Sequence, residues 1–207
     1  DRSLIGAYGH DDRVCAYPML RALLECSAPR HTVYAVLADK EETGSNGVSG
    51  MQCDILTDLL EDLSLACGAN PRAVRAASAC LSADVNAAYD PNFASVYDKR
   101  NAAYINRGVV VTKYTGARGK SGTSDASASF FGFVRQCFDD AGVVWQTGEL
   151  GNVDQGGGGT VAMYIAQHNI DTIDIGVPVL SMHAPFELVS KFDVFETYRA
   201  VKAFFRT

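Results

Sequence analysis

Short apolar runs alternate with longer amphipathic stretches along most of this 207-residue chain. The short runs are rich in β-branched and aromatic residues, which favours strands. They predict strands at 3–8, 32–38, 79–83, 108–113, 143–147 and 172–181. The stretches between them have helical spacing and predict helices at 12–26, 50–67, 123–141, 158–168 and 186–206. Pro18 should mark the start of the first helix or a kink in it. This alternation predicts an α/β fold in which helices cover both faces of a sheet.

Composition narrows the possible functions. The chain is 47% hydrophobic and 20% charged, which is typical of one globular domain with its own core. Its net charge is −6 and it has no block of lysine or arginine, so we expect no nucleic-acid partner. No apolar run reaches the length of a membrane helix, so no membrane partner is expected. None of the six cysteines forms a C-x-x-C pair; we expect buried free thiols, no zinc–thiolate site and a cytoplasmic location.

Two adjacent glutamates follow the uncharged run 33–38, in the sequence Asp-Lys-Glu-Glu-Thr-Gly-Ser at 39–45. Adjacent glutamates usually belong to a solvated loop. At the end of a buried strand, however, Glu41 and Glu42 would repel each other and lose solvation. A metal ion bound by one carboxylate, with the other free to handle a proton, would satisfy both charges.

Acidic or histidine residues follow three other predicted strands. Asp11 follows 3–8, Asp84 follows 79–83, and His183 follows 172–181. Because strand ends meet at one edge of an α/β sheet, we expect these side chains to lie near Glu42. Oxygen and imidazole donors without thiolate suit zinc, manganese or cobalt. A carboxylate shared between two ions can hold them about 3.5–4 Å apart.

Each of these residues also has a simpler interpretation. Asp84 could cap the following segment, and His183 could be a hydrogen-bonded core histidine. Asp12 competes with Asp11 for a bridging position, or could instead hold Arg13 or the local backbone. His10 could be a ligand, although a solvent-facing role is favoured.

Four motifs together resemble a known family. They are Gly-His-Asp-Asp-Arg-Val at 9–14, the glutamate motif at 39–45, Ser-Ala-Asp-Val-Asn-Ala-Ala-Tyr-Asp-Pro-Asn-Phe at 82–93, and Gly-Val-Pro-Val-Leu-Ser-Met-His-Ala at 176–184. In this order they resemble the aspartyl aminopeptidase / vacuolar aminopeptidase I family of dinuclear zinc metallo-aminopeptidases. The resemblance implies a three-layer α/β/α zinc-exopeptidase domain of the phosphorylase/hydrolase-like type. It also implies two divalent ions, a peptide substrate with a free N-terminus, and homo-oligomers.

The resemblance assigns a role to each matching residue. Asp11 would bridge both metals, and Glu41 would be the general base. Glu42 and His183 would bind one metal, and Asp84 the other.

Two further positions would contact the substrate. Lys113 matches a lysine of the substrate pocket, although a lysine on a strand is usually just exposed. Gly158 lies in the glycine run 156–159, where the family has a turn near the substrate. That run could also be a flexible loop, or a phosphate cradle, although it lacks the lysine and hydroxyl of a P-loop.

The chain also departs from the family pattern. The family's remaining metal ligand is a histidine in an upstream His-x-Asp motif, followed by an inserted dimerisation domain. His10-Asp11-Asp12 fits the His-x-Asp pattern by spacing alone, but it lies at the bridging-carboxylate motif and not upstream of it. The inserted domain matches no part of residues 1–207, and the sequence has no starting methionine. We therefore expect the C-terminal part of the catalytic domain, without its first strands, with one metal site complete and the other short of its histidine. Lys120 stands where many relatives have tyrosine, which bears on side-chain selectivity.

The sequence thus predicts a zinc-dependent aminopeptidase that removes N-terminal residues from peptides, with activity of this chain alone in question. One alternative is a related dinuclear amidohydrolase acting on N-acyl amino acids. Another is a metal-free assembly subunit, which the unmatched histidine would favour.

Overall fold

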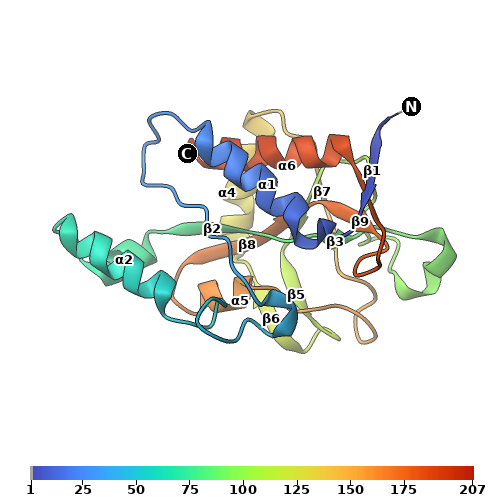
Figure 1. Ribbon diagram of the computed structural model, residues 1–207, viewed down its shortest axis with the longest axis horizontal. Coiled ribbons are helices and arrows are strands. Elements are labelled where there is room, and N and C mark those ends of the chain that lie inside the picture. Colours follow the sequence, from blue (N-terminus) through green and yellow to red (C-terminus); the bar gives the residue numbers. More distant parts are fainter. Residues whose placement is uncertain (1) are drawn as a thin grey trace.

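The computed structural model describes residues 2–207 and has a mixed α/β architecture (Figure 1). The helices are α1 (His10–Leu24), α2 (Ile55–Ala66), α3 (Pro71–Ala76), α4 (Ala128–Asp140), α5 (Ala162–Ala166) and α6 (Lys191–Phe204), with short 3-10 turns η1 (Glu41–Thr43) and η2 (Pro91–Val96). The strands are β1 (Leu4–Ala7), β2 (Ala79–Ala83), β3 (Asn86–Ala87), β4 (Val109–Thr112), β5 (Tyr114–Ala117), β6 (Ser121–Asp125), β7 (Trp145–Thr147), β8 (Asp171–Gly176), β9 (Pro178–Leu180) and β10 (Glu187–Ser190).

The strands form two four-stranded sheets and one hairpin. One sheet has the order β2-β8-β4-β7, the other has the order β1-β10-β9-β3, and β5 pairs with β6. Both larger sheets mix parallel and antiparallel neighbours. In Figure 1, α1, α4 and α6 lie on one side of the strands, and α5 and the β5–β6 hairpin lie on the other. The predicted α/β class is therefore confirmed.

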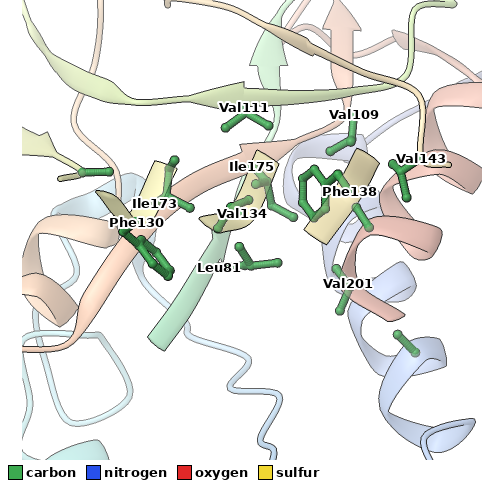
Figure 2. Close-up of a cluster of buried hydrophobic side chains, with 13 residues drawn as sticks. Leu81, Val109, Val111, Phe130, Val134, Phe138, Val143, Ile173, Ile175 and Val201 are labelled. Atoms are coloured by element: carbon green, nitrogen blue, oxygen red, sulfur yellow. The ribbon is translucent and has the colours of Figure 1, made fainter. Parts of the chain in front are cut away.

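The main core lies between α4 and the β2-β8-β4 part of the sheet (Figure 2). Phe130, Val134 and Phe138 recur every four residues, so all three side chains share one face of α4. They pack against β4 and β8, where Val109 and Ile173 are almost fully buried. This packing holds β8 and β4 beside β2, the strand that Asp84 follows.

Two predicted elements are divided in the structure. The predicted strand 172–181 becomes β8 and β9, which belong to different sheets. At Gly176 the chain passes so close to another segment that a Cβ atom would lie 1.5 Å from the carbonyl oxygen of Asp84. The predicted helix 186–206 begins instead as strand β10, and only the part after Ser190 is helical. Ser190 accepts a hydrogen bond from Phe192 N and so caps α6.

Other boundaries move for similar local reasons. Residues 123–125 belong to the β5–β6 hairpin, and α4 begins after the N-cap Ser127. The predicted helices 50–67 and 158–168 shorten to α2 and α5. Helix α1 runs through Pro18, and its non-helical dihedral angles fall at Asp11 and Asp12, so the prediction of an irregularity at Pro18 is wrong.

The predicted strand 32–38 is wrong. These residues belong to no strand, and Leu37 is 59% exposed. A strand requires a neighbour that completes its hydrogen bonds. Here the segment instead lines a cavity of about 1150 Å³ that β2 also lines.

The prediction that the cysteines are buried is only partly correct. Cys15 is buried, four others are half-buried, and Cys67 is exposed. Within residues 2–207, no helix is both long enough and apolar enough to cross a membrane.

Candidate metal centre

The chain turns sharply between β1 and α1, and this turn places Asp11. Gly9 has φ 74°, in the left-handed region that favours glycine. Asp11 and Asp12 follow with non-helical dihedral angles, and the peptide bond between them is cis. The two carboxylates therefore leave the backbone before the regular part of α1 begins.

The glutamate pair is presented by a closely packed turn. Ser45 N donates to Lys40 O at 2.7 Å, and Gly44 N donates to Glu41 O at 2.9 Å. Ser45 is buried, and its carbonyl oxygen would lie 2.2 Å from a Cβ atom at position 50, so only glycine fits there. The turn thus fixes Glu41 and Glu42, although the segment before them pairs with no strand within residues 2–207.

Asp84 and His183 each follow a strand, as the sequence predicts. Asp84 N donates to Ile175 O at 3.0 Å, and the Asp84 carboxylate accepts from Val85 N at 2.8 Å. His183 follows β9 and has φ 64°, in the left-handed region, so the chain turns sharply there. These local contacts set the position of each side chain at the end of its strand.

Glu187 joins two of these segments and was missed in the sequence. Glu187 is only 2% exposed, and its carboxylate accepts from Asp11 N at 3.1 Å and from His183 N at 2.8 Å. Glutamate at the start of a strand resembles an ordinary surface residue. Its short distance from His183 along the chain was the one available signal.

Asp11, Glu42 and His183 meet in one group. His183 Nε2 lies 2.8 Å from Asp11 Oδ2 and 3.1 Å from Glu42 Oε1. Asp11 is 9% exposed in its side chain, whereas His183 and Glu42 are about 60% exposed, at 61% and 58%. One ligand atom from each residue lies within 4.8 Å of the others, a spacing that can hold a metal ion.

Asp11 belongs to a second group with Asp12 and Asp84. Their ligand oxygens also lie within 4.8 Å of one another. Asp12 Oδ1 is buried and has no hydrogen-bond partner among the described residues. A buried acceptor without a partner is costly unless a proton or a cation meets it. The residues present therefore fit a divalent cation bound by oxygen.

The electrostatics of the cluster agree with this fit. Burial and the nearby carboxylate of Glu42 raise the pKa of Asp11 to about 6, although His183 acts in the opposite direction. Burial raises the pKa of Asp12 to about 8 and that of Asp84 well above its usual range. Burial, followed by Glu42 and Asp11, also raises the pKa of Glu41. A bound cation would reverse these penalties by favouring the charged carboxylates.

Lys113 and Gly158 do not join either group. The Lys113 ammonium pairs with Asp125 on β6. A Cβ atom at position 158 would meet nothing within 4 Å, whereas one at Gly157 would lie 2.4 Å from Gly116 O and one at Gly159 2.8 Å from Gly122 O. Packing against the β5–β6 hairpin therefore explains Gly157 and Gly159 but leaves Gly158 open.

Comparison with known proteins places these features in one family. Residues 1–205 match the family model described as Aminopeptidase I zinc metalloprotease (M18). A probable M18 family aminopeptidase 1 from Clostridium acetobutylicum is 45% identical over 99% of this chain and 45% of its own length. One of the same name from Thermotoga maritima is 45% identical over 98% of this chain and 46% of its own length.

Solved structures give the same result. The crystal structure of an M18 family aminopeptidase from Thermotoga maritima has a TM-score of 0.95 and 44% identity, covering 100% of this chain and 47% of that one. The mApe1 dodecamer of S. cerevesiae has a TM-score of 0.81 and 26% identity, covering 98% and 46%. The predicted fold is therefore confirmed. The chain spans about half the length of the relatives it matches.

Proposed function

The chain belongs to the M18 family of zinc metalloproteases, and from that premise we propose that it carries the metal centre of an aminopeptidase. One observation supports this most strongly, namely that Asp11 is a member of both ligand groups. A carboxylate common to two groups is suited to bridge two divalent cations. The names of the relatives support removal of N-terminal residues from peptides.

The donor set favours zinc, with manganese or cobalt also compatible. Asp11, Glu42 and His183 would hold one ion, and Asp11 and Asp84 would hold the other. Asp12 belongs to the same group as Asp11 and Asp84. When bound, such ions polarise the scissile carbonyl and lower the pKa of water.

Glu41 is the residue that we propose as general base for the attacking water. It is half-buried, and it lies beside Glu42 but outside both ligand groups. Its raised pKa brings it closer to the value that suits a general base near neutral pH. We infer that Glu41 takes a proton from the attacking water and gives it to the leaving amine.

We also propose where the peptide substrate binds. A peptide with a free amino terminus would contact the open backbone at Gly158 and the partly exposed side chain of Lys113, which pairs with Asp125. The dodecamer of the yeast relative supports a homo-oligomer for the whole protein.

A chimera tests this function at full length. Residues 1–207 would replace the matching 46% of the Thermotoga maritima relative, and hydrolysis of aminoacyl and N-acetyl-aminoacyl anilides would be measured with added zinc. We expect cleavage of the free-amine substrates only, and a loss of about 10²–10⁴-fold in Glu41→Gln with zinc content unchanged. Cleavage of the acylated substrates would favour an amidohydrolase, and a folded chimera that holds no zinc would favour an assembly subunit.

A further inference from the structure

The face of the β2-β8-β4-β7 sheet that turns away from α4 carries a buried row of polar side chains. Ser82 of β2, Asp174 of β8 and Thr112 of β4 occupy paired positions on neighbouring strands, so their side chains project from the same face. Leu81 and Ile173, one position away along the strands, point to the opposite face and belong to the main core. Because β8 lies between β2 and β4, a buried carboxylate is at the centre of this row.

Asp174 is only 6% exposed, and two hydroxyl groups act on its carboxylate. Ser82 Oγ donates to Asp174 Oδ1 at 2.8 Å. The second hydroxyl is that of Thr160, which lies just before α5 on the side of the strands opposite α4 (Figure 1). Burial raises the pKa of Asp174 to about 6, and the Thr160 and Ser82 hydroxyls act in the opposite direction.

The Thr160 side chain depends on this carboxylate for its position. Thr160 is itself 6% exposed, and within residues 2–207 its Oγ1 has no other hydrogen-bond partner. A buried hydroxyl without a partner costs free energy. Contact with Asp174 therefore holds the Thr160 side chain in place.

The glycine run 156–159 is in turn held at both ends. At its start, Arg118 N donates to the first carbonyl oxygen of the run at 2.7 Å. At its end, the next residue is Thr160, whose side chain acts on the Asp174 carboxylate. Between these points, a Cβ atom at Gly158 would meet nothing within 4 Å. Glycine backbone has wide conformational freedom, so the position of this open segment depends on the two ends.

The same carboxylate holds the strand that leads to the metal centre. Its hydrogen-bond partner Ser82 precedes Asp84 by two positions. Asp84 belongs to the second of the two ligand groups. Asp174 therefore joins the end of the glycine run to the strand that leads to Asp84.

We propose that Asp174 is a positioning residue, which fixes the glycine run 156–159 relative to the Asp84 end of β2 and so fixes where a peptide lies relative to the metal centre. It acts through Thr160 and Ser82 and is itself buried. The inference rests on the proposed function, in which the peptide contacts this run. If the run is not held, it must be ordered when the peptide binds, which raises KM more than it lowers kcat.

Thr160→Val tests the contact, because valine has nearly the shape of threonine but no hydroxyl. In the chimera with the Thermotoga maritima relative, we expect KM for aminoacyl anilides to rise on the order of tenfold. The kcat and the zinc content should stay within about twofold. Thr160→Ser keeps the hydroxyl and should restore most of the original KM. Thr197→Val is the matched control, since Thr197 is fully buried on α6 and donates to Asp193 O at 2.8 Å; it should lower stability without raising KM.

A double-mutant cycle tests whether Asp174 and Thr160 act through one contact. Asp174→Asn removes the charge from the acceptor and should raise KM at least as much as Thr160→Val does. In the double variant Thr160→Val/Asp174→Asn, KM should be no higher than in Asp174→Asn, because the contact is already lost.

Hydrogen exchange tests the same contact without any activity assay. The amides of Gly156 and Tyr164 lie on either side of the open segment and donate to backbone oxygens at 2.8 Å and 3.0 Å. In the chimera in EDTA, Thr160→Val should speed their exchange on the order of tenfold, whereas Thr197→Val should leave it unchanged.

Several outcomes would overturn the inference. One is unchanged exchange at both amides in Thr160→Val, and another is an unchanged KM in that variant. A KM that rises equally in Thr197→Val, or independent effects of the two substitutions in the double variant, would also contradict it. If the unsubstituted chimera cleaves no peptide, the proposed function fails, whereas faster exchange in Thr160→Val would still support the contact between Asp174 and the run.

Discussion

Replacing Glu187 by glutamine tests how the metal centre is held together. The carboxylate accepts one hydrogen bond from Asp11 N and one from His183 N, and it is almost fully buried. Glutamine keeps the shape and one acceptor oxygen, but its NH₂ group must face one of the two N–H donors. One of the two segments therefore loses its attachment.

The magnitude follows from the two bonds. A hydrogen bond to a charged acceptor contributes about 1.5–3 kcal/mol, and the bond that remains weakens because its acceptor is now neutral. We expect Glu187→Gln to lower the free energy of unfolding by about 2–4 kcal/mol. Because His183 is positioned through this contact, zinc affinity should fall by about 10–100-fold.

Urea unfolding in EDTA measures the first effect, and competition with a zinc chelator measures the second. Glu61→Gln is the matched control, since Glu61 is exposed on α2, and its effect should stay within about 0.5 kcal/mol. If Glu187→Gln behaves like this control in both assays, Glu187 does not position the ligands. A loss of stability with unchanged zinc affinity would restrict its role to folding.

Two other predictions concern pH and the glycine run. The folded-state pKa values of Asp11 and Asp12 are raised from 3.8 to about 6 and about 8, so the folded chain binds more protons than the unfolded chain in this range. Its metal-free stability should therefore fall between pH 5 and pH 8, as urea unfolding in EDTA would show, and a rise would contradict the assigned burial. Gly157→Ala places a Cβ atom 2.4 Å from Gly116 O at φ 91°, so it should cost about 1–3 kcal/mol, whereas Gly158→Ala meets open space. Equal melting temperatures for the two variants would refute this distinction.

Local sequence signals predicted much of the fold and of the ligand groups. Asp11, Asp84 and His183 each follow a strand, and strand ends converge, so their proximity could be expected before the structure. The strand 79–83 has its predicted bounds because it is a short apolar run between polar segments. In contrast, the sequence predicts one helix over 186–206 and misses β10, because the four residues of this strand directly precede α6.

The remaining features depend on distant partners. Residues 32–38 have a strand's composition, but pairing requires a neighbouring edge that local sequence does not reveal. Glu187 acquires its role only because the folded chain brings Asp11 N and His183 N to the same carboxylate. The roles of Lys113 and Gly158 remain predictions, since neither residue contacts the ligand groups.

Zinc content per chain, measured by elemental mass spectrometry on three variants, tests the central claim that Asp11 serves two cation sites. Glu42→Ala removes a ligand from one group, Asp84→Asn removes one from the other, and Asp11→Asn removes one from both. The account predicts that Asp11→Asn loses as much zinc as the other two variants lose together. If Glu42→Ala alone loses as much zinc as Asp11→Asn, the two groups do not share a bridging carboxylate and the claim fails.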